Sequence, residues 1–183
     1  LFESGEISIV DLVSPSAGFV DGGQMITVFG RRFNHRSACR INSKTASTLF
    51  MTSSQIACEV PPNPAGSYLV EVKDKSTYES SSFAEFLYHV KPVIDKVTPA
   101  RAYKGGVITI HGANFERTSS LSCVFGGETF ISATWLSPAL VACTVPDVHY
   151  GNLTIDISNF ADSFAGGGFF EASSEWLGKN YTI

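Results

Sequence analysis

Long apolar runs and helical patterning are both missing from this chain. Its apolar runs last only a few residues, whereas a membrane-crossing helix needs about 20. No charged and then apolar leader stands at its start. We therefore expect a piece of a longer or processed protein whose signal peptide or anchor lies elsewhere, and no membrane contact from this segment.

Concentrated charge of one sign is missing too. The net charge is −4 at pH 7, and acids and bases are spread evenly. Residues 1–90 carry 7 Lys and Arg against 9 Asp and Glu, and the remainder carries 6 against 8. Because a protein that grips nucleic acid needs a concentrated basic surface, this distribution argues against a nucleic-acid partner.

The common catalytic and metal-binding motifs are also missing. The chain has no Gly-x-Ser-x-Gly elbow, no Cys-x-x-Cys pair and no Asp-x-Asp series, and its 4 His residues lack ligand spacing. Glu85 and Asp95 could contribute to a calcium site, but such sites gather several acids close in sequence. We therefore expect no enzymatic activity, no metal and no cofactor.

The chain carries one pattern twice. Residues 12–62 contain a proline, a Gly-Gly pair, the run Ile-Thr-Val-Phe-Gly, a phenylalanine and two cysteines, and residues 97–146 repeat that order. Pro15 and Pro99 are 84 positions apart (99 − 15), which is the length of a small domain. We predict two tandem domains, residues 1–90 and 91–172, followed by a tail, residues 173–183, that leads into a further domain.

Strand signals dominate both repeats. Short runs rich in β-branched residues alternate apolar with polar positions, and Gly, Pro, Asn and Ser separate them, which is typical of small antiparallel sandwiches. The predicted fold class is all-β, as two tandem β-sandwiches. Gly30 and Gly112 close the strongest strand of each repeat. We expect them to permit a bend that turns Phe33 and Phe115 into the core.

The order Pro, Gly-Gly, Ile-Thr-(Ile/Val)-x-Gly-x-x-Phe, Cys…Cys-x-Val-Pro resembles the IPT/TIG domain, an immunoglobulin-like fold. The resemblance covers residues from about 8 to 90 and from about 92 to 172. The second copy departs by lacking one residue between Gly106 and Ile108, which should only shorten a turn. The resemblance implies seven-stranded sandwiches and several kinds of host: plexins, the hepatocyte growth factor receptor, fibrocystin-like surface proteins, intracellular transcription factors and bacterial carbohydrate enzymes.

Each repeat holds two cysteines at equivalent places, 19 and 20 positions apart, and none is left over. This favours the disulfides Cys39–Cys58 and Cys123–Cys143, and hence an oxidising compartment outside the cell or at its surface. The alternative is buried free thiols in a cytosolic sandwich. Asn152 and Asn180 each begin an N-glycosylation sequon, although about one such match is expected by chance here.

Two groups of side chains are candidates for contacts. The first is basic and could dock an acidic protein, an anionic glycan or a phosphate backbone, but a solvated loop balanced by nearby acids is the favoured interpretation: Arg31, Arg32, Arg36 and Arg40. The second is aromatic and could form an interface with Trp176 of the tail: Phe160, Phe164, Phe169 and Phe170. We expect at least two of these phenylalanines to fill the core, with glycines 166–168 making the turn between the last two strands.

The leading hypothesis is a non-enzymatic segment of a larger extracellular or cell-surface protein. It would contact other proteins, including copies of itself or neighbouring repeats, through exposed sheet edges, and it would act as a spacer, since Pro92 stiffens the short junction between the repeats. An extracellular filament is a sharper form of this hypothesis, and a glycan is a further candidate partner. The alternatives are an intracellular DNA-binding or dimerising regulator and an accessory module of a carbohydrate-active enzyme.

Overall fold

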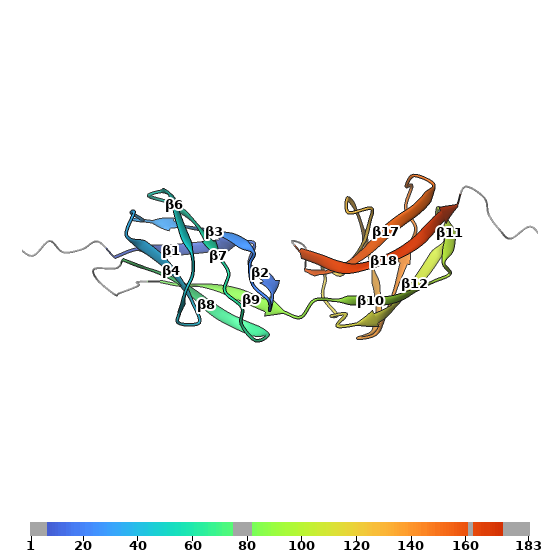
Figure 1. Ribbon diagram of the computed structural model, residues 1–183, viewed down its shortest axis with the longest axis horizontal. Coiled ribbons are helices and arrows are strands. Elements are labelled where there is room, and N and C mark those ends of the chain that lie inside the picture. Colours follow the sequence, from blue (N-terminus) through green and yellow to red (C-terminus); the bar gives the residue numbers. More distant parts are fainter. Residues whose placement is uncertain (1–6, 75–81, 161–162, 174–183) are drawn as a thin grey trace, which may run out of the picture. The chain divides into compact units, whose positions relative to one another are not determined.

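The computed structural model describes residues 7–74, 82–160 and 163–173, and all of its elements are β-strands (Figure 1). The chain divides into two compact units, residues 1–90 and 91–183, which we call the first and the second module. Within the described ranges, no helix is long and apolar enough to cross a membrane. The prediction of two all-β sandwiches is confirmed.

The first module consists of a four-stranded and a five-stranded sheet. The four-stranded sheet has the order β1 (Ile9–Ser14), β3 (Met25–Arg31), β7 (Gln55–Glu59) and β6 (Thr48–Thr52). The five-stranded sheet has the order β2 (Ala17–Phe19), β9 (Ala84–His89), β8 (Gly66–Asp74), β4 (Ser37–Ile41) and β5 (Lys44–Thr45). Neighbouring strands are antiparallel, except that β2 runs parallel to β9.

The second module repeats this arrangement. Its four-stranded sheet has the order β10 (Val93–Thr98), β12 (Val107–Ala113), β16 (Leu140–Thr144) and β15 (Thr134–Ser137). Its five-stranded sheet has the order β11 (Arg101–Tyr103), β18 (Ser163–Ser173), β17 (Gly151–Phe160), β13 (Ser122–Phe125) and β14 (Thr129–Ser132). Here β11 runs parallel to β18.

Among the described residues each module has nine strands, more than the seven that the family resemblance implies. The difference arises because two stretches of chain pass from one sheet to the other and are each divided in two. The first crossing lies at Pro15 and Pro99, where the preceding peptide bonds are cis, and it separates β1 from β2 and β10 from β11. The second lies at Ala46 and Ala133, and it separates β5 from β6 and β14 from β15.

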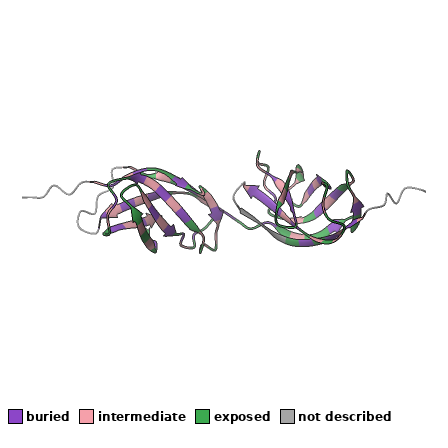
Figure 2. Ribbon diagram, turned by 90° about the horizontal axis from the view of Figure 1, so that it is seen from above, coloured by how far each residue is buried: buried purple, intermediate pink, exposed green. Residues whose placement is uncertain are grey.

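Both modules have their own hydrophobic core, and buried and exposed residues alternate along the strands (Figure 2). In the first module a disulfide joins Cys39 of β4 to Cys58 of β7, with the two Cα atoms 6.2 Å apart. In the second module Cys123 of β13 is joined to Cys143 of β16, with a Cα separation of 6.4 Å. Each bridge therefore links the two sheets of its own sandwich through the core.

The glycines that close the strongest strands do make room for an aromatic ring. Phe33 and Phe115 are 3% and 2% exposed and belong to the two cores. A Cβ added to Gly30 would lie 2.5 Å from the Cζ atom of Phe33, and one added to Gly112 would lie 2.8 Å from that of Phe115. The predicted bend at the glycine itself is not found. β3 and β12 continue past the glycine, and the bulge lies in the partner strands β1 and β10.

The predicted deletion between Gly106 and Ile108 is wrong. The Gly23 amide donates to the Val60 carbonyl at 2.8 Å, and the Gly105 amide makes the same bond to Val145 at 2.9 Å. Gly105 is thus the counterpart of Gly23. Ile26 and Ile108 each follow their glycine by three positions, so no residue is missing between them. The second module is instead shorter before this glycine, between the cis proline and the turn.

The glycines 166–168 do not form a turn, contrary to the prediction. They lie inside β18, where the pairing with β17 shifts between Ile155 and Ile157. Gly167 adopts a φ of 67°, and its amide donates to the Asp156 carboxylate at 2.7 Å. A left-handed residue at a bulge favours glycine, so these glycines bend a long strand.

Candidate interaction surface

The four-stranded sheet of the first module has apolar side chains on both of its sides. The inward side is the core. On the solvent side, which we call the apolar face, exposed or half-buried side chains come from all four strands: Leu12, Met25, Phe29, Leu49, Met51 and Ala57. Of these, Leu49 is 64% exposed and Met25 is 52% exposed.

Strand pairing brings apolar side chains together at two places on this face, while between β3 and β7 Phe29 faces Gln55 and Ala57 faces Thr27. Leu12 of β1 pairs with Phe29 of β3, and Leu49 of β6 pairs with Ala57 of β7. A shallow hollow of about 340 Å³ lies on the same sheet, lined by Asp11, Leu12, Phe29, Gly30, Ser54 and Gln55. Large exposed apolar side chains gathered on one face of a domain are typical of a contact site.

The second module has only part of this surface, since Val107 and Leu136 of its four-stranded sheet are 61% and 49% exposed. The same pairing positions there hold Lys96 opposite His111, in place of Leu12 opposite Phe29. Thr134 opposite Ala142 takes the place of Leu49 opposite Ala57. The two apolar pairs are therefore a feature of the first module and not of the shared fold.

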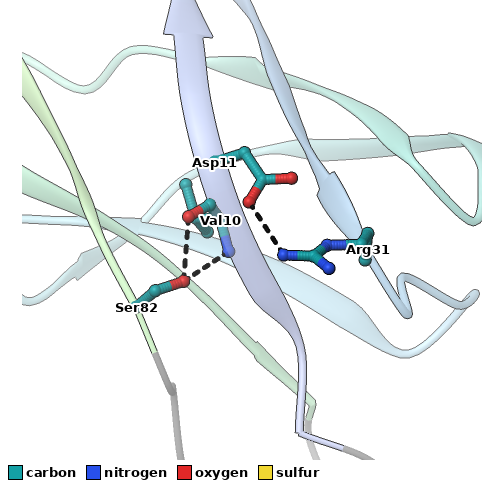
Figure 3. A network of polar contacts seen from close by, with 4 residues as sticks. All are labelled: Val10, Asp11, Arg31 and Ser82. Carbon is teal, nitrogen blue, oxygen red and sulfur yellow. Dashed lines mark hydrogen bonds and ion pairs between the residues drawn. The ribbon is translucent and has the colours of Figure 1, made fainter.

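The two edges of this sheet differ. At the β1 edge the Ser82 hydroxyl accepts the Val10 amide at 2.6 Å and donates to the Val10 carbonyl at 2.9 Å, so it occupies both backbone groups (Figure 3). Beside it, Arg31 forms an ion pair with Asp11 at 3.3 Å (Figure 3). A β-bulge lies at the same place. The edge β6 has a bulge as well, so it is the charges and the occupied backbone groups that protect the β1 edge from another strand.

The opposite edge, β6, has none of these charges. No Asp, Glu, Lys or Arg occurs between Thr45 and Cys58. The Thr48 hydroxyl accepts the Cys39 amide at 2.9 Å and donates to the Ala46 carbonyl at 3.0 Å, which anchors the start of the strand. The edge is thus held in place and uncharged.

The predicted arginine group is spread over two sheets and a turn. Arg31 ends β3 of the four-stranded sheet and pairs with Asp11, while Arg40 lies on β4 of the five-stranded sheet and donates to the Ser43 carbonyl at 2.9 Å. Arg32 has a positive φ of 65°, and the Arg36 amide donates to the Asn34 side chain at 2.7 Å. The four arginines therefore do not lie on one loop, and Arg40 is half-buried.

The predicted aromatic group divides as well. Phe170 is 3% exposed in the second core, Phe160 is half-buried, and Phe169 is 71% exposed opposite Thr154. The Phe164 side chain, Trp176 and Asn180 lie outside the described residues, as does most of the tail. Of the two sequon asparagines, Asn152 is described, and it is exposed near the start of β17.

Titratable groups with shifted pKa values are scattered rather than gathered. Burial raises the pKa of Glu116 and lowers that of His89. A hydrogen bond from Arg101 lowers the pKa of Glu171, and one to Asp147 raises that of Lys104. A hollow of about 660 Å³ in the second module includes Asp147, but Lys104 already pairs with this acid at 2.7 Å.

In the part of the chain that the structure describes, no three His, Cys, Asp or Glu side chains come close enough to hold a metal ion. The hydrogen bonds of both modules are those of a folded sandwich.

The apolar face was missed from the sequence, although a signal exists. In Met-Ile-Thr-Val-Phe (25–29) and Leu-Phe-Met (49–51) apolar residues occupy successive positions, so both sides of the strand are apolar. An alternating pattern would leave one side polar. A surface strand whose residues do not alternate between apolar and polar is thus the sequence signal of this site.

Both modules match the family model described as IPT/TIG domain, over residues 8–89 and 92–171. The chain belongs to the IPT/TIG family. It is 24% identical to fibrocystin-L of Homo sapiens over 161 residues, which are 84% of this chain and 4% of that protein. It is 28% identical to plexin A3 of Danio rerio over 148 residues, or 75% of this chain and 8% of that protein.

Among solved structures, the chain resembles the full extracellular region of plexin A4, with a TM-score of 0.48 and 17% identity over 92% of this chain and 16% of that one. This likeness concerns the fold. The chain spans less than a tenth of the length of the curated relatives named above. These IPT/TIG domains in tandem are therefore like those of plexin and fibrocystin-like proteins.

Proposed function

We propose that this IPT/TIG pair is a non-enzymatic protein-interaction segment of a larger extracellular or cell-surface protein. The apolar face of the first module is its contact surface. The observation that carries the proposal is the exposure of large apolar side chains on all but one strand of this sheet, with Leu12 at 51%, Met25 at 52% and Leu49 at 64%. Burying such side chains against a partner is favourable by about 25 cal/mol for each Å² removed from water.

The extracellular location is supported by the disulfides Cys39–Cys58 and Cys123–Cys143. Such bridges persist in oxidising compartments and are rare in the cytosol. Asn152 fits the same location as a glycan acceptor, because its side chain is exposed and Thr154 is exposed on the same side of β17. The second module, which lacks both apolar pairs, serves as a spacer in this proposal.

Site-specific photo-crosslinking in the full-length protein on its native cells tests the contact surface. A photoreactive amino acid replaces Met25, and its structural counterpart Val107, the first residue of β12 and 61% exposed, is the matched control. We expect covalent adducts with a partner protein from position 25 and none from position 107. Equal adduct patterns at both positions, or none at position 25, would contradict the proposal.

The compartment is tested separately by a non-reducing peptide map of the natively purified protein. Linked peptides for both disulfides and a glycan on Asn152 are the expected result. Free thiols on all four cysteines would contradict an extracellular location.

A further inference from the structure

The edge strand β6 has nearly the same order of residue types when its sequence is read in either direction. Its sequence is Thr48-Leu49-Phe50-Met51-Thr52, with a hydroxyl residue at each end, an aliphatic residue next to each, and Phe50 at the centre. In an antiparallel two-fold pair of this strand centred on Phe50, Leu49 of one copy faces Met51 of the other, twice. The bulge between Phe50 and Thr52 puts Thr48 on the core side and Thr52 on the solvent side, so the matched segment is Leu49–Met51. Such self-complementarity is what an isologous contact requires.

We propose that β6 is a self-association site through which two copies of this chain join their four-stranded sheets. The partner is a second copy of this chain, paired antiparallel through β6. This inference goes beyond the proposed function, because it needs no foreign partner.

Exposure and charge support the pairing. Leu49 and Met51 are 64% and 50% exposed. Opposed residues of an antiparallel pair lie on the same side of the sheet, so these side chains would cover one another across the junction. No charge between Thr45 and Cys58 would be brought close to its own copy. A strand of different sequence would not provide the two equivalent Leu49–Met51 contacts.

The edges β1 and β15 of the four-stranded sheets are less suited to pairing. The β1 edge is closed by Ser82, as described above. On β15, the counterpart of β6 in the second module, Pro138 follows the strand directly. The Trp135 indole there donates to the Phe115 carbonyl at 3.0 Å, which ties that side chain to its own module. Proline at a strand end is a common protection against edge pairing.

The contact is expected to be weak. A bulge between Phe50 and Thr52 twists β6 and limits the length of the paired segment. Short interfaces of this kind give transient association. We therefore expect a reversible monomer–dimer equilibrium that depends on concentration.

Sedimentation equilibrium of the disulfide-intact chain, up to about 1 mM, measures this association. Leu49→Lys and Met51→Glu are each expected to weaken it by roughly tenfold or more, because each puts a charge opposite an aliphatic side chain. The double variant L49K/M51E restores it, because Lys then faces Glu at both ends of the pair. An equimolar mixture of the two single variants is expected to form a heterodimer for the same reason.

Leu12→Lys is the control on the same sheet. It alters the apolar face far from β6 and should leave self-association unchanged, while a foreign partner that docks on the face would be lost. A wild-type chain that stays monomeric throughout overturns the inference, as does equal weakening by Leu12→Lys. A double variant and a mixture that both stay monomeric overturn the pairing centred on Phe50. Crosslinking at position 25 can succeed or fail independently of these results.

Discussion

Gly30 is the residue that decides where the ring of Phe33 can lie. A side chain at this position would collide with the carbonyl oxygen of Ile9 on the neighbouring strand and with the ring itself. Phe33 then fills the end of the core, where it is 3% exposed. The spacing Gly-x-x-Phe predicted this packing, since only glycine lets an aromatic ring close over the strand it follows.

We expect Gly30→Ala to lower the free energy of unfolding of the first module by about 2 kcal/mol, because the core must shift to admit a methyl group. Gly23→Ala in the same module is the control. Gly23 has a φ of 78° and nothing within 4 Å of the added Cβ, so only backbone strain of about 1 kcal/mol is expected there. Denaturant unfolding of both variants measures the difference, and equal losses would show that the ring contact is unimportant.

At the scale of elements, the two edges of the first four-stranded sheet show where sequence reasoning ends. Alternation within a run identifies a strand, but whether its edge is open depends on residues far away. Ser82, which closes the β1 edge, is 72 positions from Val10. Nothing local to β1 could have indicated this bond.

Other element-scale misses have the same cause. The glycines 166–168 were predicted as a turn from composition, but pairing with β17 places them within a strand. The all-β fold and the paired repeat were predictable because turn residues and periodicity are local or duplicated signals. The apolar face needed the sheet order, which sets which strands lie side by side.

We expect Ser82→Ala to destabilise the first module by about 1 to 2 kcal/mol, because the amide and the carbonyl of the buried Val10 both lose their partner. Amide exchange at Val10 should become faster. Ser53→Ala, at an exposed turn serine, is the control and should change neither quantity. Unchanged exchange at Val10 in Ser82→Ala would mean that the hydroxyl does not close this edge.

At the scale of the whole molecule, the chain is two separately cored sandwiches. The buried clusters share no residue, and each has a disulfide of its own. Because the apolar pairs Leu12–Phe29 and Leu49–Ala57 occur only in the first module, duplication of the fold has not duplicated the proposed contact surface.

Removing one disulfide should therefore affect one module. We expect C39A/C58A to lower the stability of the first module by about 3 kcal/mol on the loop-entropy model, and to leave the second unfolding transition in place. C123A/C143A is the matched control and should show the reverse. Differential scanning calorimetry measures both transitions, and a joint shift in either variant would contradict independent modules.

The parallel pairing of β2 with β9 has a mechanical consequence. These strands lie near the entry and the exit of the first module, with Ala17 beside Leu87 and Phe19 beside His89. A pull on the chain ends loads such a pair in shear, so its hydrogen bonds must fail together rather than one after another. If these hydrogen bonds break, the module can extend, but the disulfide keeps the segment between Cys39 and Cys58 closed. This segment spans 19 positions, so about 65 Å of chain cannot extend. Each module can thus yield under tension only by a limited length.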